Sequence, residues 1–186
     1  MKKTAAVILF LLSATAHAHH ANPFWYAGVA YSTLNVDLKA AGAQGDGDSE
    51  PSAINFVVGR ELNKYFAVEG LLNKGIYDDK VSGAGANFAF ELNYAIGASA
   101  VGILPISETF NVYGKLGLAR VEYEDDARGS ADASGAIYGA GATFDINKQF
   151  SLNAEYIQYP DGDYDGSSVF DDVEASAFNI GVSFKF

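Results

Sequence analysis

The chain has 186 residues, of which 49% are apolar and 13% aromatic, and its mean hydropathy is +0.04. The absence of cysteine excludes disulfides and thiolate metal sites. A formal net charge of −11 argues against nucleic acid as a partner, because phosphate binding needs a basic surface. After the N-terminal segment, no apolar run approaches the roughly 18–20 residues of a membrane-spanning helix, which excludes a helical membrane protein. The length fits a single domain.

Residues 1–18 have the pattern of a cleaved export signal. A basic start is followed by an apolar stretch over 5–12 and a small-x-small cleavage site at 16–18. We therefore predict a signal peptide over 1–18 and a mature domain over 19–186, and loss of the two N-terminal lysines makes the formal net charge −13. A short buried helix is the less favoured interpretation. Cleavage after Ala16 is an alternative, and it would leave a His-Ala-His terminus able to bind copper or nickel.

Apolar residues occupy every second position in eight segments of the mature chain, the period that is typical of β-strands. In chain order the segments are 25–36, 54–59, 65–72, 86–98, 110–121, 137–144, 150–158 and 177–186. The alternation is less clean in the first, fifth and seventh segments, and Leu71 breaks it in the third. It is clearest in the last segment, where the alternate positions are Phe178, Ile180, Val182, Phe184 and Phe186.

One face of these segments is aliphatic and aromatic, whereas the other is mostly Gly, Ala, Ser and Asn. Small residues suit the crowded interior of a narrow barrel, and aromatic residues suit lipid. Short connections alternate with long ones at 37–53, 73–86, 122–135 and 159–174. The sequence therefore predicts an all-β fold, an eight-stranded antiparallel up-and-down transmembrane β-barrel with short periplasmic turns and longer extracellular loops. A soluble eight-stranded barrel or sandwich is the alternative.

Three segments, GRELNKYFAVEG, ASAVGILPISETFNVYGKLGLA and FNIGVSFKF, together with the export signal, resemble the small eight-stranded outer-membrane barrels of the OmpA/OmpX type. The resemblance covers nearly all of the mature chain, but not the peptidoglycan-binding domain of full-length OmpA. It implies location in the cell outer membrane, contact with membrane lipid and lipopolysaccharide, and assembly by the barrel-assembly machinery, and we expect a monomer. The assembly signal would be Phe186, Phe184, Val182 and Ile180.

The predicted long loops hold 17 of the 23 acidic residues but only four basic ones. This segregation is what membrane insertion requires, because a charge facing lipid at the midplane costs about 2–4 kcal/mol. The simplest interpretation is that the acids keep the loops solvated. The functional interpretation is that the loops bind divalent cations among anionic lipopolysaccharide head groups.

One of these loops has the spacing of a calcium-binding loop. Residues 161–172, DGDYDGSSVFDD, follow the pattern D-x-D-x-D-G-x5-E, except that an Asp replaces the final Glu. Calcium prefers several oxygen ligands, which closely spaced carboxylates around a Gly turn provide. The candidate calcium ligands are Asp161, Asp163, Asp165 and Asp172. Acidic, glycine-rich loops also produce this spacing by chance, and we expect no other cofactor.

Strand alternation places four charged residues on the small-residue face that would line the barrel: Glu69, Glu91, Lys115 and Glu155. The family resemblance implies that they form a central ion network that blocks continuous water passage. Buried ions need partners because desolvation costs several kcal/mol each. The alternative is a narrow, low-conductance, cation-preferring channel. Arg120 instead shares the apolar face, which places it at the outer rim unless the register shifts.

We do not expect an enzyme. Outer-membrane barrels that are hydrolases or acyltransferases use an active-site histidine, whereas the histidines here, His17, His19 and His20, all lie at the cleavage junction. The predicted role is structural or surface-interactive. Adhesion to another cell is a further possibility for which the loop sequences indicate no ligand.

Overall fold

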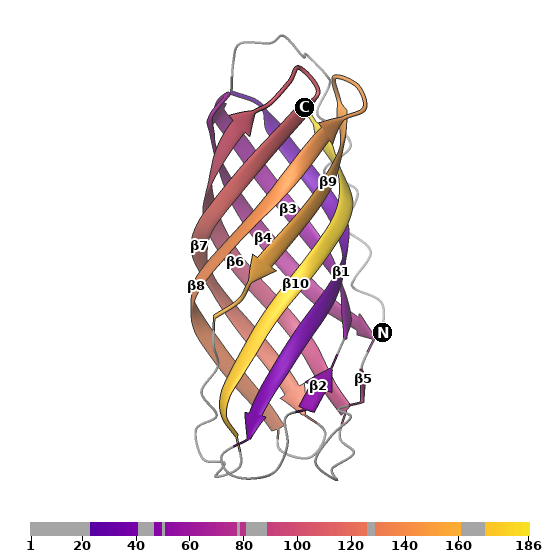
Figure 1. Ribbon diagram of the computed structural model, residues 1–186, viewed down its shortest axis with the longest axis vertical. Helices are drawn as coiled ribbons and strands as arrows, with labels where there is room; N and C mark the ends of the chain where they lie inside the picture. Colours follow the sequence, from indigo (N-terminus) through magenta and orange to yellow (C-terminus); the bar gives the residue numbers. More distant parts are fainter. Residues whose placement is uncertain are drawn as a thin grey trace, which may run out of the picture.

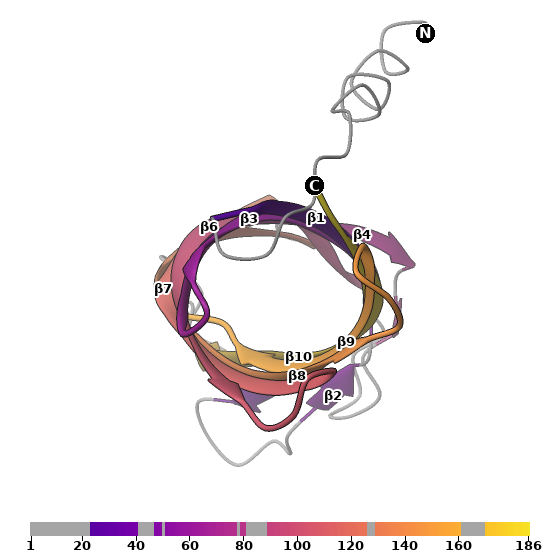
Figure 2. The ribbon, with the colours of Figure 1, turned by 90° about the horizontal axis from the view of Figure 1, so that it is seen from above.

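The computed structural model shows an antiparallel sheet that closes on itself into a tall barrel with tilted strands (Figures 1 and 2). The structure describes residues 23–40, 47–49, 51–77, 79–80, 89–125, 129–160 and 170–186, and within them the side chains of 36–40, 47–49, 79–80, 89–92, 123–125, 129–132 and 170–174 are not described. The predicted signal peptide lies outside these ranges. The described residues contain no helix that is both long and apolar enough to cross a membrane.

Eight long strands form the wall, and the short strands β2 and β5 extend it at the end where the long connections lie. The strands are β1 (Trp25–Ala40), β2 (Gly47–Ser49), β3 (Ser52–Asn63), β4 (Phe66–Tyr77), β5 (Asp79–Lys80), β6 (Ala89–Pro105), β7 (Phe110–Asp125), β8 (Gly129–Asp145), β9 (Phe150–Gln158) and β10 (Phe170–Lys185). Each long strand pairs with its neighbours along the chain, and β10 pairs with β1. The predicted eight-stranded up-and-down barrel is therefore confirmed.

Barrel closure is completed at the short-turn end by a pair of backbone hydrogen bonds. The Trp25 amide donates to the Phe186 carbonyl at 3.0 Å, and the Phe186 amide donates to the Trp25 carbonyl at 2.8 Å. The ladder continues from this pair along β1 and β10 as far as Ala40 and Phe170. The sheet therefore has no open edge between its first and last long strands, which is the arrangement that a barrel in lipid requires.

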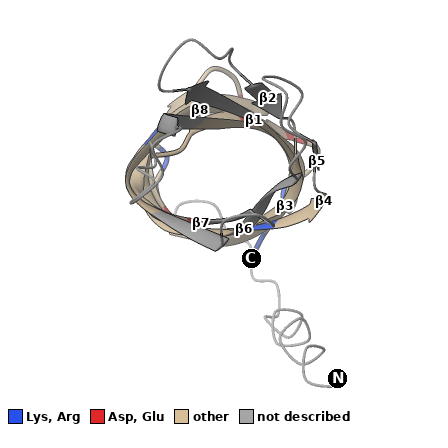
Figure 3. Ribbon diagram, turned by 90° about the horizontal axis from the view of Figure 1, so that it is seen from below, with Lys and Arg blue, Asp and Glu red and all other residues tan. Residues whose placement is uncertain are grey.

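The outward face is apolar, as the strand alternation predicts. Leu116 and Leu118 on β7 are 65% and 70% exposed, whereas Lys115 just before them and Ala119 just after them are buried. Exposure of this many large apolar side chains would be unfavourable in water but suits a hydrocarbon environment. In the view from the long-connection end, nearly all of the described wall is uncharged (Figure 3).

The strands are longer at the long-connection end than the sequence predicts. The predicted loop over 122–135 is wrong in this respect, because β7 continues to Asp125 and β8 begins at Gly129. Glu122 and Asp132 face each other in that ladder, so part of the acidic charge assigned to loops lies on strands. Charged side chains are unfavourable in lipid, but they do not prevent backbone hydrogen bonding between strands. The strands therefore continue beyond the level at which their lipid-facing residues end.

Glycine is required where two strands approach closely on the interior side. A Cβ atom built on Gly117 would contact the Ala98 carbonyl and lie 2.7 Å from the Ser99 Cα, and both are rigid backbone atoms. A Cβ built on Gly102, on the lipid-facing side, would come no closer than 3.9 Å to the Gly114 carbonyl. The wall is therefore tightly packed at Gly117 and open at Gly102.

We predict that Gly117→Ala destabilises the folded barrel by about 1–3 kcal/mol, as overpacking does. Gly102→Ala is the matched control and should unfold at the wild-type urea concentration. Urea titration in lipid vesicles, followed by heat-modifiable gel mobility, measures both. Equal unfolding midpoints for the two variants would contradict the close approach of β6 and β7 at Gly117.

Candidate functional site

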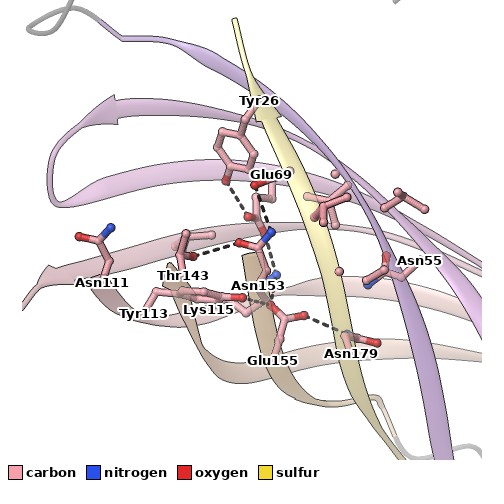
Figure 4. Close-up of a pocket in the computed structure, with 18 of the residues that line it drawn as sticks. Tyr26, Asn55, Glu69, Asn111, Tyr113, Lys115, Thr143, Asn153, Glu155 and Asn179 are labelled. Carbon is pink, nitrogen blue, oxygen red and sulfur yellow. Dashed lines mark hydrogen bonds and ion pairs between the residues drawn. The ribbon is translucent and has the colours of Figure 1, made fainter. Parts of the chain in front are cut away.

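The barrel interior holds a buried ion triad. Lys115 of β7 lies between two carboxylates, with its Nζ 2.6 Å from Glu69 Oε2 on β4 and 2.6 Å from Glu155 Oε2 on β9. The three side chains are 2%, 10% and 7% exposed. Because each comes from a different strand and points inward, the triad ties opposite parts of the wall together across the interior (Figure 4).

Neutral side chains complete the hydrogen bonding of the two carboxylates. The Tyr26 hydroxyl donates to Glu69 Oε1 at 2.6 Å, and the Tyr113 hydroxyl donates to Glu155 Oε2 at 3.0 Å. The Asn179 amide donates to Glu155 Oε1 at 3.1 Å. Every carboxylate oxygen of the triad therefore has a partner (Figure 4), which is the condition under which buried ions are tolerated.

A second ion pair lies near the short turns, and a cavity extends along the interior from this pair past the triad. Lys185 Nζ is 2.6 Å from Asp145 Oδ1, which also accepts a hydrogen bond from Ser151. A cavity of about 100 Å³ lies beside both ionic groups, and the buried Asn55 lines it with an Oδ1 atom that has no protein partner. Such a buried oxygen requires a donor, and a polar cavity of this size accommodates several water molecules.

The other half of the interior is filled by a hydrophobic plug. Leu34, Ile137 and Ile157 are 1%, 0% and 0% exposed and belong to one packed cluster with Leu71 and Tyr159. The Asn73 amide donates to the Tyr159 hydroxyl at 2.6 Å within this layer. The plug lies on the long-connection side of the triad, so the interior is polar toward the short turns and apolar toward the long connections.

The structure brings together three of the four predicted interior ions, Glu69, Lys115 and Glu155. Glu91 is on β6, but its side chain is outside the description. Arg120 is exposed on the outer face, and the β7 ladder shows no register shift that would turn it inward.

The predicted calcium loop falls largely outside the described residues. This applies to Asp161, Asp163 and Asp165, while Asp172 lies on β10 with an undescribed side chain. Among the described side chains, no three His, Asp or Glu residues lie close enough to hold a metal ion. The loop therefore stays a prediction.

The predicted assembly residues lie on the outer face of β10 and at its end. Ile180 and Val182 are exposed, and the rings of Phe184 and Phe186 stack with centroids 6.1 Å apart. Phe150 on β9 adds a third ring, 5.2 Å from Phe184. Their geometry presents a continuous apolar strip, and their role in assembly stays a prediction.

Sequence reasoning missed the plug and the neutral partners of the triad. The signal for the plug was present, because Leu71 broke the alternation and Ile137 lay on the small-residue face. The pairing of Tyr26 with Glu69, which are 43 positions apart, depends on the register between strands and has no local signature.

Comparison with known proteins agrees with this geometry. The model of the outer membrane protein beta-barrel domain matches residues 4–186. The chain belongs to this family. It is therefore an outer-membrane β-barrel protein, and its predicted location in the outer membrane is confirmed. No protein in the search of curated sequences matches it.

Solved structures of other outer-membrane barrels have the same fold as this chain. Ail, the attachment invasion locus protein of Yersinia pestis, in complex with the heparin analogue sucrose octasulfate, is 22% identical with a TM-score of 0.59, and the match covers 89% of this chain and 99% of Ail. Neisserial surface protein A is 18% identical with a TM-score of 0.60, covering 87% and 97%. OprG of Pseudomonas aeruginosa is 14% identical with a TM-score of 0.60, covering 90% and 98%.

We predict that Lys115→Met destabilises the barrel by about 3–5 kcal/mol, because it leaves two buried carboxylates without a cation. The triple variant Glu69→Gln, Lys115→Met, Glu155→Gln removes all three charges and should recover most of that loss. Urea unfolding in neutral lipid vesicles gives both values. A single variant as stable as the wild type would show that the triad does not stabilise the interior.

Proposed function

We propose that this outer-membrane barrel is a closed structural and surface-interaction protein that anchors its long connections outside the cell. The observation that carries the proposal is the filled interior, in which the plug residues Leu34, Ile137 and Ile157 are almost completely inaccessible. Apolar constrictions exclude water and ions by dewetting. The ion triad adds a second barrier, because its charged groups are occupied by one another and by neutral hydrogen-bond donors. A narrow cation-preferring channel is the alternative.

We predict that the wild-type barrel leaves a planar lipid bilayer electrically sealed. The double variant Leu71→Ala, Ile157→Ala should produce discrete openings, since it removes apolar volume from the plug. Leu116→Ala, which shortens a lipid-facing side chain of β7, is the matched control and should stay sealed. Stepwise cation-selective currents from the folded wild-type protein would contradict the closed barrel and support the channel alternative.

The charge at the long-connection end suggests the kind of partner. Acidic residues dominate these segments, and their negative field attracts cations and repels polyanions. Ail is known in complex with a heparin analogue, a highly sulfated ligand. The acidic segments here favour the opposite chemistry, so we propose divalent cations as their first ligands, with residues 161–172 as the strongest candidate segment.

We predict that calcium binding to the folded barrel weakens by at least about tenfold in the Asp161→Asn, Asp163→Asn variant, since two carboxylate ligands are lost. Asp48→Asn, in another acidic segment, is the control and should leave the affinity unchanged. Isothermal titration calorimetry in neutral micelles measures the affinities. Unchanged heats of binding in the double variant would show that this loop does not bind calcium. The proposal of a closed barrel would not be affected.

A further inference from the structure

Two hydrogen-bonded Tyr–Glu pairs occupy equivalent places on opposite sides of the barrel interior. In each, the tyrosine faces a glycine of the next long strand, and that glycine faces the glutamate of the long strand after it. The first set is Tyr26, Gly59 and Glu69, and the second is Tyr113, Gly141 and Glu155. Both tyrosine hydroxyls donate to their glutamates. The second set begins on β7, half-way around the wall from β1, so the interior has approximate twofold symmetry.

The two halves differ at the position that carries the lysine. Lys115 is the inward residue two positions after Tyr113, and it lies between the two glutamates. The residues two and four positions after Tyr26 are Gly28 and Ala30, which are small and uncharged. Both line the cavity that extends along the interior past the triad. The cavity therefore occupies the space that a second lysine would fill on the β1 side.

The polar half of the interior has more carboxylates than cations. Its described charged side chains are four acids and two lysines: Glu61, Glu69, Asp145, Glu155, Lys115 and Lys185. Lys115 is shared by two carboxylates, and Lys185 is paired with Asp145. The described side chains therefore carry an excess of negative charge beside the cavity. Water does not neutralise such a charge, and buried ions need partners of opposite sign.

A buried amide oxygen without a protein partner also lines this cavity. Asn55 of β3 is 2% exposed, and its Oδ1 atom accepts no hydrogen bond from the described residues. Asn55 faces Ala30 in the β1–β3 ladder, on the side of the interior that lacks a lysine (Figure 4). A buried oxygen of this kind requires a donor or a cation. The surrounding excess of carboxylates favours a cation over a neutral ligand.

We propose that the cavity binds one monovalent alkali cation, with Asn55 Oδ1 and water as its ligands and the carboxylates of Glu69 and Glu155 as its counter-charge. The ion takes the place of the second lysine. Carbonyl oxygens replace the hydration shell of potassium in proteins. The cavity of about 100 Å³ accommodates an ion with several water molecules.

The chemistry of the cavity disfavours a divalent ion. Calcium takes many oxygen ligands, and magnesium requires near-ideal octahedral geometry. Among the described side chains, no group of three acidic residues or histidines is arranged to hold such an ion. The proposed ion is therefore distinct in kind and in place from the divalent cations proposed for the long connections, and it does not depend on them.

The test is urea unfolding of the full-length barrel in neutral lipid vesicles, with potassium chloride or N-methylglucamine chloride at equal ionic strength. The organic cation is too large for the cavity. A bound ion stabilises only the folded state, so potassium at about ten times its dissociation constant should raise the wild-type midpoint by about 0.5–1 M urea. Equal wild-type midpoints in the two salts would overturn the proposal.

Two variants separate the cavity from cation binding elsewhere. Asn55→Leu removes the ligand oxygen, and Ala30→Lys places an ammonium group in the cavity, so both should lose the difference between the salts. Leu71→Ala, in the plug, is the matched control. It should lower both midpoints and keep the difference. A potassium effect that persists in folded Asn55→Leu would overturn the site.

Thallium(I), a heavy substitute for potassium, locates the ion without relying on variants that fold. Crystals of the wild-type barrel grown with thallium(I) acetate in place of potassium should show an anomalous peak in the cavity beside Asn55 Oδ1. A cavity that contains only water would overturn the proposal. Anomalous peaks confined to the acidic long connections would do the same.

Discussion

Pairing of the backbone in a medium without water is the constraint on which the rest of this structure depends. In lipid, an unpaired N–H or C=O group costs several kcal/mol, so a sheet must have no edge. The first and last long strands therefore meet, and the two hydrogen bonds between Trp25 and Phe186 complete the ring. Closure with eight strands leaves an interior just wide enough for side chains. Small residues such as Gly117 are needed inside for that reason, and bulky ones are free to face lipid.

The narrow interior also explains why its charged groups occur as a triad. A single ion there would lose its hydration and gain nothing in return. Lys115 instead lies between Glu69 and Glu155, whose carboxylates replace the lost water contacts. The plug strengthens this arrangement, since removal of water lowers the local dielectric and increases the attraction between the ions. Leu71, next to the lipid-facing Leu72 on β4, contributes to the plug two positions from Glu69 on the same inward face. Packing and electrostatics in the interior therefore depend on each other.

Much of this architecture could be predicted because a strand has a period of two. Parity alone assigns Glu69, Lys115 and Glu155 to the interior and Arg120 to the outer face. The odd or even position of a residue in its strand does not tell how far along the barrel axis the residue lies, because that depends on the register between strands. The contacts of Tyr26 and Asn179 therefore could not be predicted. The ends of β7 and β8 were missed for a different reason. Their alternation stops where lipid stops, whereas their hydrogen bonds continue to Asp125 and Gly129.

Leu71, which breaks the alternation on β4, carries the most information about function. Two adjacent leucines on β4 can both be favourable only if lipid lies on one side of the wall and an apolar layer on the other, because burial against polar groups would gain Leu71 little. The interior is therefore divided rather than uniformly polar. The cavity beside the ion triad is lined by Glu61 and Lys185, near the short turns, and the plug separates it from the long connections. The polar groups of the interior therefore lie toward the short turns, and its apolar layer lies toward the long connections.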